Sequence, residues 1–167
     1  MKAYLEPTPI IDFRHPGILE FAQEFTSEKD AIAKAIKLYE KVRDHFLYNP
    51  FDIKTEGEHL RASALLARGH GHCIDKAVFL IACSRALGIP ARLGLSRVKN
   101  HIGTARFEQI IQSNELVPHG YAELYLAGEW IKCTPAFNAS LCAKLGVEPL
   151  EFDGRNHSQF QQYTEGG

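Results

Sequence analysis

The pattern of apolar and polar residues predicts helices over most of the first half of the chain. Apolar residues recur at steps of three and four along one stretch: Ile32, Ile36, Tyr39, Val42 and Phe46. This spacing places them on one face of an α-helix. Ser27 is the expected N-cap of that helix, with Asp30 in the acidic position of a capping box. Shorter helices are predicted around residues 18–25 and over residues 58–68.

A different pattern marks residues 71–92, GHCIDKAVFLIACSRALGIPAR. Residues 77–83 are apolar on every side, which indicates a helix buried in a core rather than one lying on a surface. Gly88 stands where a left-handed C-terminal cap is expected, and Pro90 prevents the helix from continuing. Cys73 therefore lies in the first turn of a buried helix.

The second half of the chain shows the period-two alternation of β-strands. Apolar and polar residues alternate over 91–96 and again over 121–126, where a turn at 127–129 leads into the returning strand 130–133. Residues 99–117 fit no element, a helical turn is expected near 140–145, and a short strand near 150–152. Because helices come first and an antiparallel sheet follows, the order is that of an α+β domain.

Composition narrows the function classes. With 167 residues, 45% hydrophobic and 23% charged, the chain has the size and make-up of one globular domain spanning residues 1–167. A formal net charge of −1 gives no electrostatic case for nucleic acid or an anionic membrane as a partner. No apolar run is long enough to span a bilayer, and the N-terminal residues do not form a signal peptide, so a cytoplasmic location is expected.

The four cysteines are expected to be reduced thiols, since they show no CxxC spacing. Cys83, inside the apolar run, is interpreted as a core residue. Cys73 has small and polar neighbours, and a cysteine at a helix N-terminus tends to have a lowered pKa and to be nucleophilic. His119, just before strand 121–126, is the best candidate for the base that a thiol nucleophile needs.

A metal site is the alternative interpretation of the same region. His70, His72 and Cys73 all carry zinc-binding groups, but three ligands within four residues leave poor geometry for a tetrahedral site. We therefore expect no metal and no cofactor. The two histidines are interpreted as loop residues facing solvent, and Asp75 and Lys76 as surface charges of the first turn.

Two motifs resemble those of the transglutaminase-like superfamily. The first is Gly71-His72-Cys73 with the run RALGIPAR at 85–92; the second is HGYAELYL at 119–126, followed by Gly128 and Trp130. They stand in the family's order, with Cys73 and His119 46 residues apart (119 − 73). The resemblance covers a core of about residues 27–138. It implies a papain-like α+β fold in which N-terminal helices precede a central cysteine-bearing helix packed on an antiparallel sheet.

The resemblance also implies roles for individual residues. Cys73 would be the nucleophile and His119 the general base and acid. The family's third member is an acid after the tryptophan strand, and Thr134 occupies its position here. A hydroxyl can orient an imidazole, but it cannot stabilise the imidazolium as a carboxylate does.

Three interpretations of Thr134 remain open. Thr134 orients His119 weakly in an active enzyme, or Asp153 or Asn138 takes the role of the acid, or catalysis has been lost. The corresponding functions are a cysteine peptidase, amidase or acyltransferase acting on a peptide or glutamine-type amide, and a binding module that holds a peptide. In both cases the expected partner is a peptide or protein. The sequence does not determine the oligomeric state.

Overall fold

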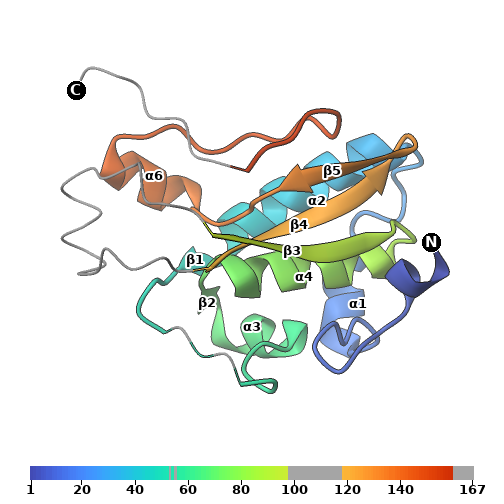
Figure 1. Ribbon diagram of the computed structural model, residues 1–167, viewed down its shortest axis with the longest axis horizontal. Helices are drawn as coiled ribbons and strands as arrows, with labels where there is room; N and C mark the ends of the chain where they lie inside the picture. The colour runs from blue at the N-terminus through green and yellow to red at the C-terminus, as the bar shows by residue number, and fades with distance from the viewer. Residues whose placement is uncertain (53, 55, 98–117, 160–167) are drawn as a thin grey trace.

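A computed structural model describes residues 1–52, 54, 56–97 and 118–159 (Figure 1). The elements in chain order are η1 (Lys2–Leu5), α1 (Pro16–Gln23), α2 (Ala31–His45), β1 (Leu47–Tyr48), α3 (Ala62–Arg68), β2 (His70–Gly71), α4 (Cys73–Ala86), β3 (Ala91–Arg97), β4 (Pro118–Leu126), β5 (Glu129–Cys133) and α6 (Ala139–Leu145). The expected order, with most helices before the sheet, is confirmed. Among the described residues, no helix is both long and apolar enough to cross a lipid bilayer.

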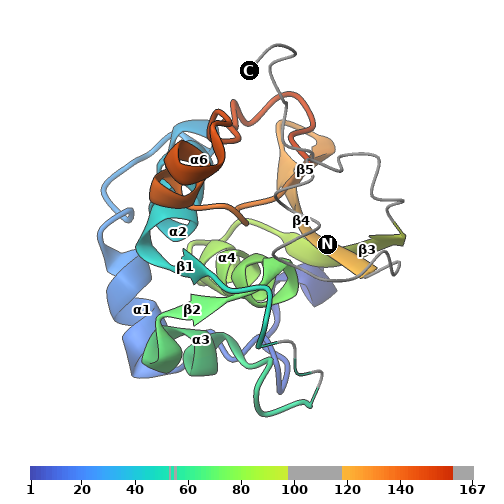
Figure 2. The same cartoon turned by 90° about the vertical axis from the view of Figure 1, so that its left-hand side faces the viewer.

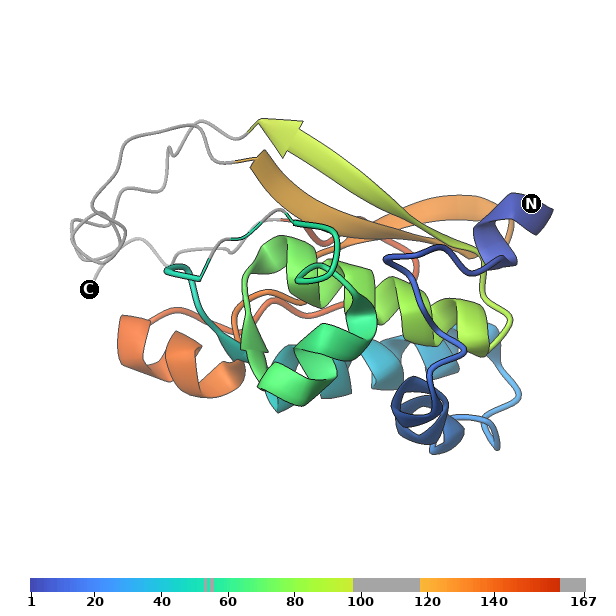
Figure 3. The ribbon, with the colours of Figure 1, turned by 90° about the horizontal axis from the view of Figure 1, so that it is seen from below.

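The strands form two separate sheets. β3, β4 and β5 make an antiparallel sheet in that order, and β1 pairs with β2 in a short parallel ladder. The large sheet lies on one side of α4, whereas α1 and α3 lie on the other (Figure 3). Helix α4 also packs against α2, so it is the element that all the others surround. The expected α+β fold with a central cysteine-bearing helix is confirmed.

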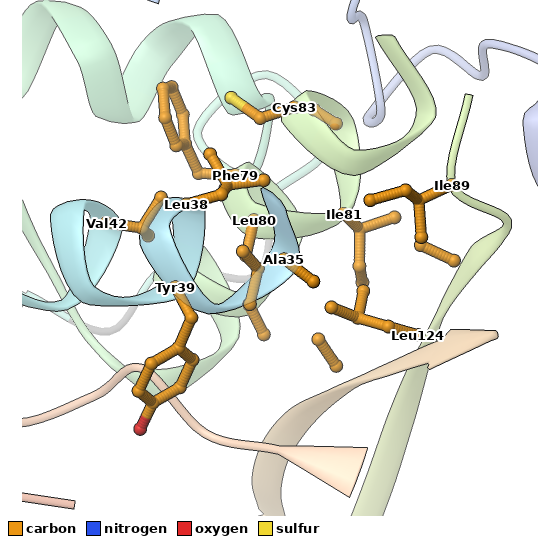
Figure 4. Packing of buried hydrophobic residues seen from close by; sticks show 14 of the residues in the cluster. Ala35, Leu38, Tyr39, Val42, Phe79, Leu80, Ile81, Cys83, Ile89 and Leu124 are labelled. Atoms are coloured by element: carbon orange, nitrogen blue, oxygen red, sulfur yellow. The ribbon is translucent and has the colours of Figure 1, made fainter. Parts of the chain in front are cut away.

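The core forms around α4 because this helix is apolar on every side, as the sequence predicts. The residues from Ala77 to Cys83 are at most 1% exposed. Figure 4 shows Phe79, Leu80 and Ile81 of this run near Leu38, Tyr39 and Val42 of α2 and Leu124 of β4. The helix ends as expected: Gly88 has a φ of +78°, in the left-handed region that a side chain disfavours. The N–H of Ile89 then donates to the carbonyl of Ser84 (2.9 Å).

Two ends of elements differ from the sequence prediction. Helix α2 is capped by Asp30 rather than Ser27, since the Asp30 carboxylate accepts from the N–H of Ala33 (2.8 Å). Residues 58–61 turn irregularly before α3 begins. Residues 150–152 form no strand, because their partners are side chains: the Leu150 carbonyl accepts from Tyr39 and Arg43. Residues 99–117 lie outside the described part of the chain.

The arrangement places several segment ends together. The first residues of α4 and of β4 lie at the same end of the molecule, beside β1 and β2 (Figures 1 and 2). Cys73 is the first residue of α4, and His119 is the second residue of β4. The fold therefore brings the two motifs to one place.

Candidate active site

Cys73 is held by a reciprocal cap at the start of α4. The ring nitrogen Nδ1 of His72 accepts from the N–H of Ile74 (3.1 Å), and the Asp75 carboxylate accepts from the N–H of His72 (3.1 Å). This pair satisfies two backbone donors that a helix end leaves free. His72 is 3% exposed, so its interpretation as a solvent-facing loop residue is wrong. The cap fixes the backbone on both sides of the cysteine.

The thiol of Cys73 points toward the start of β4. The backbone N–H of Gly120 donates to Cys73 Sγ (3.4 Å). The thiol is almost covered, and burial raises its pKa, although the backbone N–H groups of Gly120, Ile74 and Cys73 itself act in the opposite direction. The lowered pKa expected from the helix N-terminus is therefore wrong for this conformation. Loss of water around a thiolate outweighs the partial charges of the helix end.

His119 precedes Gly120 and contacts Thr134. The Nε2 of its imidazole lies 3.3 Å from the Oγ1 of Thr134, which is 3% exposed and directly follows β5. The ring also interacts with the backbone of Gln159, which raises its pKa, but burial has the larger effect and lowers the pKa overall. The structure thus brings His119 to Thr134, and it brings Cys73 to the backbone N–H of Gly120, the residue after His119. The contact with the Gln159 backbone could not be predicted, since a backbone group leaves no residue-type signal.

Thr134 is held in place by the segment after α6. The carbonyl of Ser158 accepts from the N–H of Thr134 (3.0 Å), and the N–H of Ser158 donates to the carbonyl of Lys132 (2.8 Å). This segment runs parallel to the end of β5 through a bridge between Cys133 and Ser158. A backbone ladder, rather than a side chain, therefore fixes the hydroxyl that contacts the imidazole.

The side chain of Asn138 is committed away from His119. Its Oδ1 accepts from the N–H of Tyr48 (2.9 Å), and its Nδ2 donates to the Oγ of Ser140 (2.7 Å). Both polar atoms of the amide are thereby used. Asn138 instead joins β1 to the start of α6.

Asp153 is engaged within its own turn. Its carboxylate accepts from the N–H groups of Arg155 and Asn156 (both 2.8 Å) and from the side chain of Asn156 (2.7 Å). These bonds hold the pKa of Asp153 at about 2. The residue is exposed. The carboxylate is saturated by this turn, so the structure does not bring Asp153 to the imidazole.

A buried ammonium ties the start of α4 to the rest of the site. Nζ of Lys76 donates to three carbonyls, those of Arg43 (2.7 Å), Phe46 (2.8 Å) and Ala136 (2.6 Å). Lys76 is 0% exposed and Asp75 is 1% exposed, so their interpretation as surface charges is wrong. Burial lowers the pKa of Lys76 to about 7. Three acceptors nevertheless match the three protons of an ammonium, and a neutral amine could donate only two bonds.

The three residues considered as metal ligands have other partners. Nδ1 of His70 lies 3.1 Å from Nδ2 of Asn49, while His72 caps α4 and Cys73 faces Gly120. Within the described ranges, no group of three or more histidine, cysteine, aspartate or glutamate side chains is arranged to hold a metal ion.

Solved structures of other proteins have folds similar to that of this chain. A structure of a candidate cysteine protease from Cytophaga hutchinsonii matches with a TM-score of 0.64 at 20% identity, over 80% of this chain and 41% of that one. The periplasmic domain of TgpA from Pseudomonas aeruginosa, solved with ethylmercury, matches with a TM-score of 0.51 at 20% identity, over 72% of this chain and 43% of that one. The present chain thus spans less than half of each neighbour. No curated protein matches.

The amino-acid sequence shows the family to which the chain belongs. The family model described as the transglutaminase-like superfamily matches residues 19–135. That range contains Cys73, His119 and Thr134, together with both motifs that carried the resemblance. The chain belongs to the transglutaminase-like superfamily.

Proposed function

We propose that the protein catalyses thiol-dependent acyl transfer or hydrolysis on a peptide or glutamine-type amide. One observation carries the proposal: the Gly120 N–H donates to Cys73 Sγ at 3.4 Å, while the adjacent His119 is held by Thr134 at 3.3 Å. A thiol, an imidazole and a group that orients the imidazole are the parts that covalent catalysis by cysteine requires. Here they come from α4, β4 and the residue after β5.

The reaction uses these residues in two steps. His119 takes the thiol proton as Sγ attacks the carbonyl carbon, and the carbonyl π electrons move to oxygen. The backbone N–H of Cys73 would stabilise that oxyanion. When the tetrahedral intermediate collapses, the C–N bond breaks and His119 returns the proton to the leaving amine. Water or another amine then attacks the thioester, and the thiol is restored.

The resting site is expected to be uncharged. Burial raises the pKa of Cys73 and lowers that of His119, so thiol and imidazole are both neutral at pH 7. Charge develops only when the proton moves. The neutral hydroxyl of Thr134 and the backbone of Gln159 then take the place of the family's carboxylate, which accounts for the absence of an acid at position 134.

Acylation of the thiol by p-nitrophenyl acetate tests this function. We expect a burst of one acetyl group per protein, located on Cys73 by mass spectrometry and abolished in Cys73→Ala. His119→Gln should slow the burst about 10²-fold, the lower end of what general base catalysis contributes. Cys83→Ala is the matched control, since Cys83 lies on the same helix at 0% exposure. A burst that survives in Cys73→Ala, or is unaffected in His119→Gln, would contradict the proposal.

The pH profile of the burst provides a second check. Because the neutral pair is the reactive form, the rate should be flat across neutral pH. Its acid limb should lie below the ordinary imidazole value of 6.5 and its alkaline limb above the ordinary thiol value of 9.0. A profile that rises steadily between pH 7 and 9 would instead indicate an ordinary thiol without a base.

A peptide-binding module is the second candidate function. It is favoured by Thr134, since a neutral hydroxyl stabilises an imidazolium less than a carboxylate does. A module of this kind would bind peptides without forming an acyl adduct. Stoichiometric peptide binding by calorimetry, with no acetylation of Cys73, would favour it over the enzyme.

A further inference from the structure

A buried carboxylate holds the residue that precedes Cys73. Asp75 is 1% exposed, and its Oδ2 accepts from the N–H of His72 (3.1 Å). The ring of His72 in turn accepts from the N–H of Ile74 (3.1 Å). The N–H of Cys73 lies between these two bonded groups along the chain. Because peptide units are planar, fixing the backbone of His72 limits the directions in which the N–H of Cys73 can point.

The position of this carboxylate depends on Gly71. A Cβ at Gly71 would lie 2.8 Å from both Oδ2 and Cβ of Asp75 and 2.9 Å from Cδ1 of Leu65. These distances are shorter than those of real Cβ contacts, so a side chain at residue 71 would displace the carboxylate. Gly71 also pairs with Tyr48 in the small parallel sheet. The carboxylate therefore fits against β2 only because residue 71 is a glycine.

Arg68 is the charged partner of Asp75. Its Nη2 lies 3.4 Å from Oδ2 of Asp75, and its side chain is mostly buried. Nε of Arg68 donates to the carbonyl of His70 (3.1 Å), and Nη1 donates to the carbonyl of His59 (3.2 Å). Two backbone carbonyls thus hold the guanidinium in place while it pairs with the acid. The pair joins the last residue of α3 to the first turn of α4.

The benefit of this carboxylate to a reaction at Cys73 would be geometric. Burial is the main cause of the raised pKa of Cys73, and the negative charge of Asp75 raises it further. A negative charge also disfavours an oxyanion nearby. An oxyanion donor, however, is most effective when its direction is fixed before the charge develops. Oδ2 fixes the backbone beside such a donor, the N–H of Cys73.

We infer that Asp75, held by Arg68, is a positioning residue that orients the backbone N–H of Cys73 toward the carbonyl oxygen of the amide under attack. This inference rests on the proposed function. As the C–S bond forms, the carbonyl π electrons move to oxygen, and the N–H of Cys73 donates to the resulting oxyanion. Asp75 and Arg68 exchange no proton. Collapse restores the C=O bond, the C–N bond breaks, and the amine leaves with the proton from His119.

The test compares two reactions of the same thiol in Asp75→Ala. Acylation by p-nitrophenyl acetate passes through an oxyanion, whereas alkylation by iodoacetamide is a direct displacement without one. Misplacement of a catalytic group by about 1 Å can cost about 10²-fold, so acylation should slow by about that factor. Alkylation should be unchanged or faster, because the thiol loses a neighbouring negative charge.

Asp75→Asn is the conservative variant that tests for rescue. The amide oxygen can replace Oδ2 as the acceptor for the N–H of His72. The amide nitrogen can replace Oδ1, which accepts no hydrogen bond from the described residues. Most of the acylation rate should therefore return although the charge is gone. Acylation as slow as in Asp75→Ala would contradict a geometric role.

Asp44→Ala is the matched control. Asp44 also accepts from a backbone N–H at the start of a helix, that of Ala139 in α6 (2.9 Å), and also pairs with an arginine, Arg43 (2.8 Å). Its loss should lower the Tm but leave the ratio of the acylation rate to the alkylation rate unchanged. An equal fall of this ratio in Asp44→Ala would overturn the inference.

Arg68→Met keeps the inference testable if Asp75→Ala does not fold. The change removes the arginine and leaves the carboxylate bonded to the N–H of His72. The ratio of acylation to alkylation should fall in the same direction as in Asp75→Ala, by a smaller factor. An unchanged ratio in folded Arg68→Met would contradict the part assigned to Arg68.

The remaining outcomes overturn the inference in distinguishable ways. If both rates of Asp75→Ala fall equally, the carboxylate acts on the thiol and not on an oxyanion. If neither rate falls, the N–H of Cys73 keeps its direction without Asp75. If the wild-type protein itself is not acetylated on Cys73, the proposed function fails and the inference fails with it.

Discussion

The first turn of α4 and the remainder of the same helix are both buried, but they are buried in different surroundings. From Ala77 to Cys83 the neighbours are hydrocarbon side chains of α2 and the sheet. In the first turn, by contrast, Asp75 and Lys76 are covered by backbone and polar groups. The apolar part stabilises the fold through burial, whereas the polar part stabilises one geometry around Cys73. The extent of burial alone therefore does not distinguish residues that stabilise the fold from residues that fix the geometry around Cys73.

The largest effect expected from this comparison is that of Lys76→Met. The change leaves the carbonyls of Arg43, Phe46 and Ala136 without their donor. Each buried acceptor without a partner costs about 1–3 kcal/mol, so the free energy of unfolding should fall by about 3 kcal/mol or more. Urea denaturation measures this loss.

Lys37→Met is the matched control for Lys76→Met. The side chain of Lys37 is 59% exposed and pairs with Glu28 on the surface, so its loss should cost well under about 1 kcal/mol. Equal losses in the two variants would show that the first turn is not a special environment.

A smaller loss of stability is expected for a substitution at Gly120, where β4 contacts the first turn of α4. A Cβ on Gly120 would lie 2.5 Å from Cγ1 and 2.9 Å from Cα of Ile74, so Gly120→Ala must push β4 away from α4. Overpacking of this kind costs about 1–3 kcal/mol. The Gly120 N–H would also move from Cys73 Sγ, and the acylation burst should slow more than the loss of stability explains.

Gly57→Ala is a suitable control for this clash, because a Cβ there meets nothing within 4 Å. It should change neither stability nor the burst. If Gly120→Ala leaves the burst intact, contact between β4 and the thiol is not needed for reactivity.

The sequence predicted the apolar part of this comparison and not the polar part. Local spacing was enough for α4, its glycine cap and the strands 91–96 and 121–133, because these depend on neighbours a few residues away. The burial of Lys76 depends on Ala136, 60 residues further along the chain, and on the end of α2. A local sequence pattern gives no information about partners that lie so far along the chain.

The candidate site was likewise predictable from the sequence only in part. Cys73, His119 and Thr134 could be named from the resemblance, and the structure shows the contact between His119 and Thr134. The raised pKa of Cys73 could not be predicted, because it depends on how completely β4 covers the thiol.

The smallest expected effect is a change of the free energy of unfolding with pH. The Asp75 carboxylate lies 3.5 Å from Nε2 of His72, and the charges of Asp52, His59 and Arg68 also act on the ring. Burial lowers the pKa of His72, so below about pH 6.5 the unfolded chain binds a proton that the folded chain resists. The folded state should therefore lose stability as the pH falls through 6.5 toward 5.

His72→Asn isolates that contribution. Asparagine can still accept from the N–H of Ile74 as an N-cap, but it does not titrate. The difference in unfolding free energy between the wild type and the variant should shift with pH in favour of the variant as the solution becomes more acidic. Parallel pH curves would mean that folding does not change the pKa of His72, which would contradict this prediction.

The pairing of Ser158 with Lys132 and Thr134 leads us to expect an order of assembly in time. Cys73 precedes Ser158 by 85 residues (158 − 73), yet the hydroxyl beside His119 is fixed only once Ser158 has reached Lys132 and Thr134. We therefore expect the Thr134 hydroxyl to take its place beside His119 only when one of the last described segments has docked. Pulsed alkylation during refolding would show this as a late change in the reactivity of Cys73, after the amides of α4 have become protected from exchange.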